Sequence, residues 1–366
     1  MRQQAELDAP ASFDQADLEA LRESIVSVLA DECGSLAVHA FIDGKNSLDK
    51  TLWRQGAELG WLAVALPEAY GGLGMGARGL DVLHAELGRF TAPGPFLATL
   101  AAAQTLLATA DPAICDTWLP RIAAGEISLA VPAKVGANPP AGARITLLGA
   151  EDAAAALVPL DKGWALVDLA NARISRVSMW DRTRCMLDVE LGDAAILASL
   201  PDDGSVPITL AHTLSLGIAA DSIGGSREIS ARTIEYMKNR VQFGRPIASF
   251  QALKHRAADQ TALIATNEHL VAQAVESTAL GDPSASMWSA LAKAAASDVF
   301  LTIGSDCVQL HGGVGFTWEY DPHIYLKRAR LNEVLVATNM QLRDRAGAEL
   351  AAATRSGRST LEIPAS

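Results

Sequence analysis

The chain has 366 residues, of which 49% are hydrophobic and 20% charged, a balance typical of folded globular proteins that excludes general disorder. The formal net charge of −12 argues against nucleic acid or an anionic membrane as the main partner. The four cysteines form no C-x-x-C pair, so neither a zinc site nor a disulfide framework is indicated. The first residues include acids where a secretory signal needs basic and apolar segments, and the most apolar stretch, 96–110, is shorter than the ~18 residues of a membrane span. We therefore expect a soluble cytoplasmic protein.

At about 100–200 residues per domain, the length predicts two or three domains. Residues 1–125 have helical patterning, with a loop at 66–76 where a proline and four glycines cluster. Residues 126–206 change character, because short apolar runs recur about every ten residues between turn residues, which predicts a small antiparallel sheet or barrel. A loop is expected within it at 134–142. Residues 207–366 return to long helical runs and predict a helical bundle, with a stop at Gly312-Gly313.

Two motifs in the last region could carry chemistry. The first is Arg240-Val-Gln-Phe-Gly-Arg-Pro-Ile, followed by Phe250-Gln251. Its arginines could hold a phosphate bidentately, but the spacing equally fits a turn between helices with solvated arginines. The second is Gln309-Leu-His-Gly-Gly-Val-Gly-Phe-Thr-Trp-Glu, whose glycines would let a ligand or another backbone approach closely. It lacks the strand-turn-helix setting of a dinucleotide fingerprint, so the pattern alone is weak.

Together with Pro67-Glu-Ala-Tyr-Gly-Gly-Leu-Gly, these motifs resemble the acyl-CoA dehydrogenase family in their order and separations over nearly the whole chain. The resemblance implies an α+β fold with an N-terminal α-helical domain, a small middle β-domain and a C-terminal four-helix bundle. It also implies FAD, lying between the sheet and the bundle with its adenosine end reaching a neighbouring subunit. The resemblance also implies, by position, which residues contact FAD. They would contact the flavin phosphates or adenine, or approach the flavin across the dimer interface: Arg240, Gln242, Phe250, Gln251, Gln309, Gly312 and Gly313.

The reaction that this resemblance implies is α,β-desaturation of an acyl-CoA thioester, with electrons passing on to an electron-transfer flavoprotein. A glutamate removes the α-proton while the β-hydrogen leaves as hydride to the flavin. The common glutamate position, in an E-G-T, falls at Val336 in this sequence. The alternative position, in the first helix of the bundle, falls at Leu214, and no acid occurs from 210 to 220. Glu333, one helical turn before Val336, is the weak remaining candidate.

The middle domain also departs from the family. Where members carry a T-E-P-x-x-G-S-D-like stretch that holds the flavin ring, residues 129–140 read LAVPAKVGANPP. Apolar and proline side chains cannot supply those hydrogen bonds, although backbone N–H groups could. The chain thus resembles the non-catalytic partner in α2β2 heterotetramers of the steroid-CoA type, which completes the FAD site of a catalytic subunit. Two alternatives stay open: a self-sufficient homotetramer that uses Glu333 as base, and a non-enzymatic scaffold or ligand-binding homologue without FAD.

Overall fold

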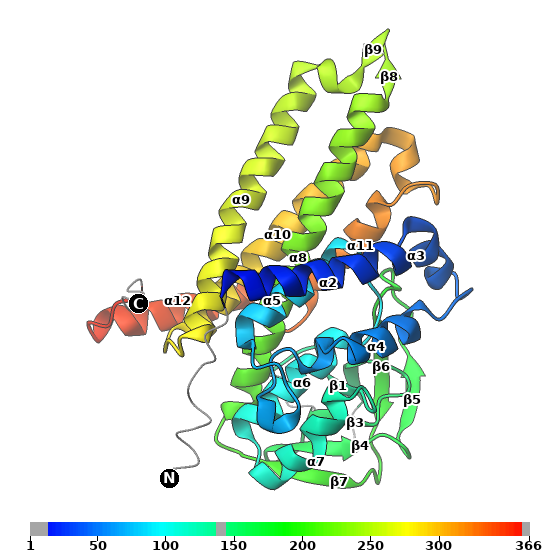
Figure 1. The fold of residues 1–366 in the computed structure, drawn as a ribbon. Helices are drawn as coiled ribbons and strands as arrows, with labels where there is room; N and C mark the ends of the chain where they lie inside the picture. Colours follow the sequence, from blue (N-terminus) through cyan, green and yellow to red (C-terminus); the bar gives the residue numbers. More distant parts are fainter. Residues whose placement is uncertain (1–13, 137–143, 361–366) are drawn as a thin grey trace.

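The computed structural model describes residues 14–136 and 144–360, which form a helical region, a sheet and a second helical region (Figure 1). The first helix begins after Asp14, whose carboxylate accepts the backbone N–H of Ala16 at 2.8 Å and satisfies a donor of the first turn. The loop expected at 66–76 is present and contains one short 3-10 turn. The helices of this region are α2 (Gln15–Glu32), α3 (Ser35–Ile42), α4 (Leu48–Glu58), α5 (Gly76–Arg89), α6 (Phe96–Thr109) and α7 (Pro112–Ala123).

The sheet has seven strands in the order β5-β6-β2-β1-β3-β4-β7. Strand β2 pairs antiparallel with one edge of β1. The chain then crosses over, and β3 pairs parallel with the other edge of β1. The small antiparallel sheet or barrel expected from the sequence is therefore wrong for this one pair of strands, which is parallel. The loop expected at 134–142 is irregular at 134–136, and 137–142 lie outside the described residues. The strands are β1 (Leu129–Pro132), β2 (Ile145–Gly149), β3 (Ala155–Pro159), β4 (Trp164–Asp168), β5 (Arg173–Arg176), β6 (Cys185–Glu190) and β7 (Ile196–Leu200).

Long helices form the second helical region. The stop predicted at Gly312-Gly313 is confirmed, because α10 ends at His311 and Gly312 adopts a positive φ of 66° that glycine tolerates without strain. A two-stranded hairpin, β8 (Val241–Gln242) and β9 (Arg245–Pro246), joins α8 to α9 at the far tip of the molecule (Figure 1). The helices are α8 (Ser205–Asn239), α9 (Gln251–Ala279), α10 (Ala285–His311), α11 (Pro322–Val334) and α12 (Asn339–Arg355).

Glycines bring α5 and α8 into unusually close contact. A Cβ added at Gly224 would lie 1.8 Å from the carbonyl oxygen of Ala85, and one added at Gly88 would lie 2.1 Å from that of Asp221. Only glycine fits at such backbone distances. Within the described residues, α8 is also long and apolar enough to cross a membrane, but 61% of its most apolar window is buried inside the protein, as core helices also show.

A buried ionic network ties the sheet to the second helical region. Asp221 of α8 accepts hydrogen bonds from Arg328 at 3.0 Å and Asn332 at 2.8 Å, both on α11, and pairs with Arg184 beside β6 at 3.0 Å. Burial alone would raise the pKa of Asp221, but the two guanidiniums and their hydrogen bonds hold it well below its usual range. Because all of these side chains are buried, the network fixes how α8, α11 and the sheet meet.

Candidate functional site: a filled catalytic position and an exposed helical tip

The two positions expected for a catalytic glutamate lie in one apolar core. Leu214 on α8 is 2% exposed, and Val336, in the loop after α11, is 1% exposed. Both belong to a single cluster of buried hydrophobic residues that also takes side chains from β1, α6 and α7. The nearest chain neighbours of Val336, Leu335 and Ala337, are buried in the same cluster. Apolar packing thus fills the place where the resemblance expects a carboxylate facing a substrate.

The loop at Val336 is joined to the segment that follows β1. The N–H of Val336 donates to the carbonyl of Ala133 at 2.8 Å, and the N–H of Val135 donates to the carbonyl of Val336 at 2.9 Å. Val336 has a φ of +66°, which is strained for a β-branched residue. Residues 133–135 occupy the stretch in which the resemblance expects the flavin-ring cradle, and the N–H of Val135 is bonded within the protein. The donor that could have replaced the missing side chains at Val135 is therefore already used.

A buried lysine holds this loop in place, and sequence reasoning missed it. Lys293 on α10 is 0% exposed, and its ammonium donates to the carbonyls of Glu333 and Ala337 at 2.9 and 3.1 Å and to Oδ1 of Asn339 at 2.8 Å. Burial lowers the pKa of Lys293 to about 7. The available signal was a single lysine within the alanine-rich run of residues 290–296.

The remaining candidate base, Glu333, takes part in a surface ion pair. Its carboxylate lies 3.3 Å from Nη1 of Arg330, whose side chain is half-exposed. Only the backbone carbonyl of Glu333 contacts the buried lysine behind the loop. This arrangement gives Glu333 the role of a partnered surface acid and gives no support to its use as a base within this chain.

The first motif forms the exposed tip of the α8–α9 pair. Arg240, Gln242 and Gln251 are all exposed, and the Arg240 side chain pairs with no acid among the residues that the structure describes. Phe243, at the hairpin turn, is 92% exposed and packs edge-on against Phe250 with the ring centroids 6.0 Å apart. The guanidinium of neighbouring Arg245 stacks over Phe250 at 4.2 Å. An unpaired arginine beside an exposed aromatic suits contact with an external molecule or chain.

The second motif ends α10 with an open turn. Gln309, Gly312 and Gly313 are exposed, and a Cβ added at either glycine would meet nothing within 4 Å, so the turn leaves space for a close approach from outside. The hydroxyl of Tyr236, one turn before the end of α8, donates to the carbonyl of His311 at 3.2 Å. This contact joins the glycine turn to the helix that carries Arg240.

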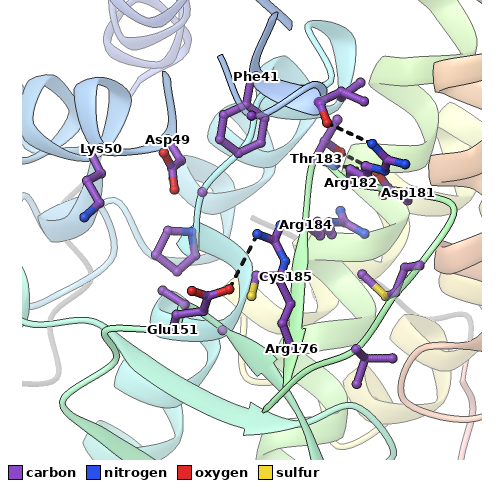
Figure 2. A pocket seen from close by; sticks show the side chains of 18 of the residues that line it. Phe41, Asp49, Lys50, Glu151, Arg176, Asp181, Arg182, Thr183, Arg184 and Cys185 are labelled. Carbon is purple, nitrogen blue, oxygen red and sulfur yellow. Dashed lines mark hydrogen bonds and ion pairs between the residues drawn. The ribbon is translucent and has the colours of Figure 1, made fainter. Parts of the chain in front are cut away.

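A larger cavity lies elsewhere in the described part of the chain. It has a volume of about 750 Å³ and opens between the α3–α4 connection, the β2–β3 turn and the stretch from β5 to β6. Figure 2 shows Arg176 reaching toward Glu151, and the two side chains lie 3.5 Å apart. Arg182 donates to the carbonyl of Ile42 at 3.2 Å. Its lining mixes acids and bases, so it specifies no single ligand chemistry. No local motif indicates it, because four segments that are distant in the sequence line it.

Comparison with known families agrees with this layout. Residues 15–126 match the acyl-CoA dehydrogenase N-terminal domain, and residues 209–350 match the acyl-CoA dehydrogenase C-terminal domain. The chain therefore belongs to the acyl-CoA dehydrogenase family, a family of flavoproteins that bind FAD.

Several individual members of the family are similar to this chain over most of its length. The chain is 33% identical over 319 residues to the acyl-CoA dehydrogenase IpdE2 of Mycobacterium tuberculosis, covering 84% of this chain and 89% of that protein. It is 30% identical over 336 residues to the acyl-CoA dehydrogenase FadE34 of the same organism, covering 86% of this chain but 45% of FadE34. A variant of the Tcur3481-Tcur3483 steroid ACAD is a solved structure with 28% identity and a TM-score of 0.80, covering 92% and 99% of the two chains. The ChsE4-ChsE5 complex from Mycobacterium tuberculosis shares the fold, with a TM-score of 0.81 at 24% identity, covering 97% and 99%.

Proposed function

We propose that this chain is the non-catalytic subunit of a heteromeric, flavin-dependent acyl-CoA dehydrogenase and that it completes the FAD site of a catalytic partner subunit. The observation that carries the proposal is the apolar core that joins Leu214 to Val336. Proton abstraction from the α-carbon needs a carboxylate within hydrogen-bond reach, and both usual positions hold buried aliphatic side chains. The complex would desaturate an acyl-CoA thioester with a glutamate from its partner and pass the electrons to an electron-transfer flavoprotein.

The described residues of this chain fit the phosphate and adenine end of FAD but not its flavin ring. The segment at Val135 offers no fit to a flavin ring, because its N–H is bonded to the Val336 carbonyl and its side chain is buried in the core. The tip and the glycine turn do fit phosphates and adenine from a site outside this chain, since Arg240 is exposed without an acidic partner and Gly312 opens to free space. FAD, when bound, supplies the hydride acceptor of the reaction. This chain would neutralise and orient the phosphate end from across the interface.

Two relatives support a partner of similar size. FadE34 is about twice the length that this chain covers, which leaves room for a second unit beside the matched one. The Tcur3481-Tcur3483 steroid ACAD is named for two components. We infer a heterotetramer with a catalytic acyl-CoA dehydrogenase chain, and a steroid-derived acyl-CoA is the first substrate class to test.

The test is the visible spectrum of the purified chain, alone and after co-expression with an acyl-CoA dehydrogenase from the same genome that retains the E-G-T glutamate and the flavin-ring motif. We expect no flavin absorption from the chain alone and a complex with half as many flavins as chains. Flavin bound by the chain alone and bleached by acyl-CoA would instead support a self-sufficient homotetramer. A colourless protein under both conditions would support a scaffold without FAD.

Within the complex, replacing Arg240 with Ala tests its assigned role. We expect weaker retention of FAD during gel filtration, because one charge-assisted contact to phosphate is lost. Arg330→Ala is the matched control, since that arginine is exposed but pairs with Glu333 away from the tip. Equal flavin content in the Arg240 variant and the control would contradict the assignment.

A further inference from the structure

A smaller cavity lies beside the glycine turn and has no assigned role. Its volume is about 330 Å³, and it opens where the end of α8, the turn after α10, the start of α11 and the start of α3 meet. We call it the α8–α11 notch. The residues that line it are Ser35, Ile229, Arg232, Glu235, Tyr236, Asn239, His311, Glu319, Tyr320, Asp321 and Pro322.

Aromatic rings form one wall of the notch. Tyr236 stacks on His311 with the ring centroids 4.1 Å apart, and Tyr320 meets both rings edge-on at 5.5 and 5.7 Å. His311 is 6% exposed, and its Nδ1 lies 2.8 Å from the carbonyl of Cys307, an atom that can only accept, so Nδ1 donates. Burial lowers the pKa of His311, which favours the neutral ring. The Nε2 atom is then an acceptor, and no hydrogen-bond partner for it is found among residues 14–136 and 144–360.

Carboxylates form the other wall, and one of them lacks a cation. Asp321 is already bonded to Arg232 at 2.5 Å, and Glu235 pairs with Lys238 at 2.5 Å. Glu319 receives only a 3.3 Å hydrogen bond from the Thr317 hydroxyl and pairs with no base in the described part of the chain. Arg232, which also lines the notch, is engaged by Asp321, so an incoming phosphate or carboxylate would be repelled by the unpaired Glu319. The unfilled acceptors and the exposed face of Tyr320 instead match a cation.

We propose that the α8–α11 notch receives an arginine side chain of the catalytic partner subunit; this rests on the proposed function. A guanidinium can stack on an aromatic face while its N–H fork reaches a carboxylate and a ring nitrogen, which a point-charged ammonium does less well. Glu319 and Nε2 of His311 supply those acceptors, and Tyr320 supplies the face.

The position of the notch argues for a protein partner rather than a free cation. His311 directly precedes Gly312, and Asn239 directly precedes Arg240, so the notch is continuous with the surface that we assign to the shared FAD site. The segment between Gly312 and Glu319 also carries exposed aromatic residues, with Phe316 64% and Trp318 54% exposed. Aromatic anchors around a charged hot spot are typical of protein–protein interfaces.

The test compares the affinity of the co-expressed catalytic chain for wild type, Glu319→Gln and Tyr320→Ala by biolayer interferometry. We expect each variant to weaken binding about tenfold or more, as hot-spot truncations do. Asp193→Asn is the matched control, because Asp193 is an exposed acid in the β6–β7 turn. Binding by Glu319→Gln within about twofold of wild type would overturn the proposal, since a desolvated guanidinium loses far more without its carboxylate.

A second measurement separates this inference from the proposed function. N-acetyl-arginine amide is titrated into the isolated chain while the ring protons of His311 and Tyr320 are followed by NMR, with N-acetyl-glutamine amide as the neutral control. Wild type that fails to bind any catalytic chain would refute the heteromer and the docking role together. Ring shifts with the arginine compound alone would then still establish the notch as a guanidinium site, whereas their absence overturns the notch itself.

Discussion

Replacing Lys293 with Met should remove a specific part of the pH dependence of stability. Burial lowers the pKa of Lys293 from its ordinary value of 10.5 to about 7 in the folded chain. Between these two pH values the unfolded chain binds more protons than the folded one, so the free energy of unfolding of the wild type rises with pH. The pKa difference, at ~1.4 kcal/mol per unit, corresponds to about 5 kcal/mol over the whole window and about 3 kcal/mol between pH 6.5 and 9.5.

The variant also leaves acceptors without a donor. Two backbone carbonyls and Oδ1 of Asn339 lose the Lys293 ammonium, which costs about 1–3 kcal/mol for each group that stays buried and unbonded. This cost is nearly independent of pH, so it lowers the stability of Lys293→Met at every pH. The disadvantage relative to wild type should therefore grow by about 3 kcal/mol from pH 6.5 to 9.5.

Urea denaturation followed by tryptophan fluorescence at pH 6.5, 8.0 and 9.5 measures this difference. Lys162→Met, a change at an exposed lysine in the turn between β3 and β4, is the matched control and should run parallel to wild type. Parallel curves for wild type and Lys293→Met would refute the reasoning, because the buried amine would then titrate as it does in the unfolded chain. A stability difference between wild type and variant that shrinks as pH rises would have the opposite pH dependence and would also refute the reasoning.

Two further substitutions test the packing that positions the site. Asp221→Asn leaves two buried guanidiniums without their carboxylate and should lower the free energy of unfolding by about 3–5 kcal/mol, measured by urea titration near pH 7; a loss below about 1 kcal/mol would contradict the network's role. Gly224→Ala places a Cβ 1.8 Å from the Ala85 carbonyl oxygen, so α5 and α8 must separate. We expect the free energy of unfolding, followed by thermal denaturation, to fall by about 1–3 kcal/mol. Gly347→Ala in α12 has nothing within 4 Å and should instead stabilise by about 0.5–1 kcal/mol; equal effects of the two alanines would count against the close-packing account.

Much of the fold follows from local patterns, and the exceptions have physical reasons. The long helices follow from apolar spacing without internal proline, and the stop at Gly312 follows from glycine's freedom at positive φ. Strand β5, with the sequence RISR, lacks the apolar run that marks the buried strands, because it lies at an edge of the sheet and is largely exposed. The parallel pairing of β1 with β3 depends on which edge of β1 the chain returns to, and no local pattern encodes that choice.

Part of the candidate site could likewise be predicted from the sequence, and part could not. Counting along the motifs predicts that Val336 and Leu214 replace the glutamates, and the exposure of Arg240 and Gly312 suits the roles assigned to them. Sequence alone could not tell whether the vacated position would be an empty pocket or a packed core. That outcome depends on the hydrogen bonds between Val135 and Val336 and on Lys293, and these contacts join segments far apart in the chain.

The strained backbone at Val336 connects these observations. A β-branched residue at a φ of +66° persists only where its surroundings over-determine it. Here α11 is tied at Arg328 to the buried Asp221, and Lys293 bonds the carbonyls on either side of the loop. These contacts hold the loop while the side chains of Leu335, Val336 and Ala337 pack in the core. The tip, by contrast, keeps a large apolar side chain in solvent, since Phe243 is 92% exposed. Burying that surface against a second chain would remove the cost of its exposure, which supports the proposed association with a catalytic partner.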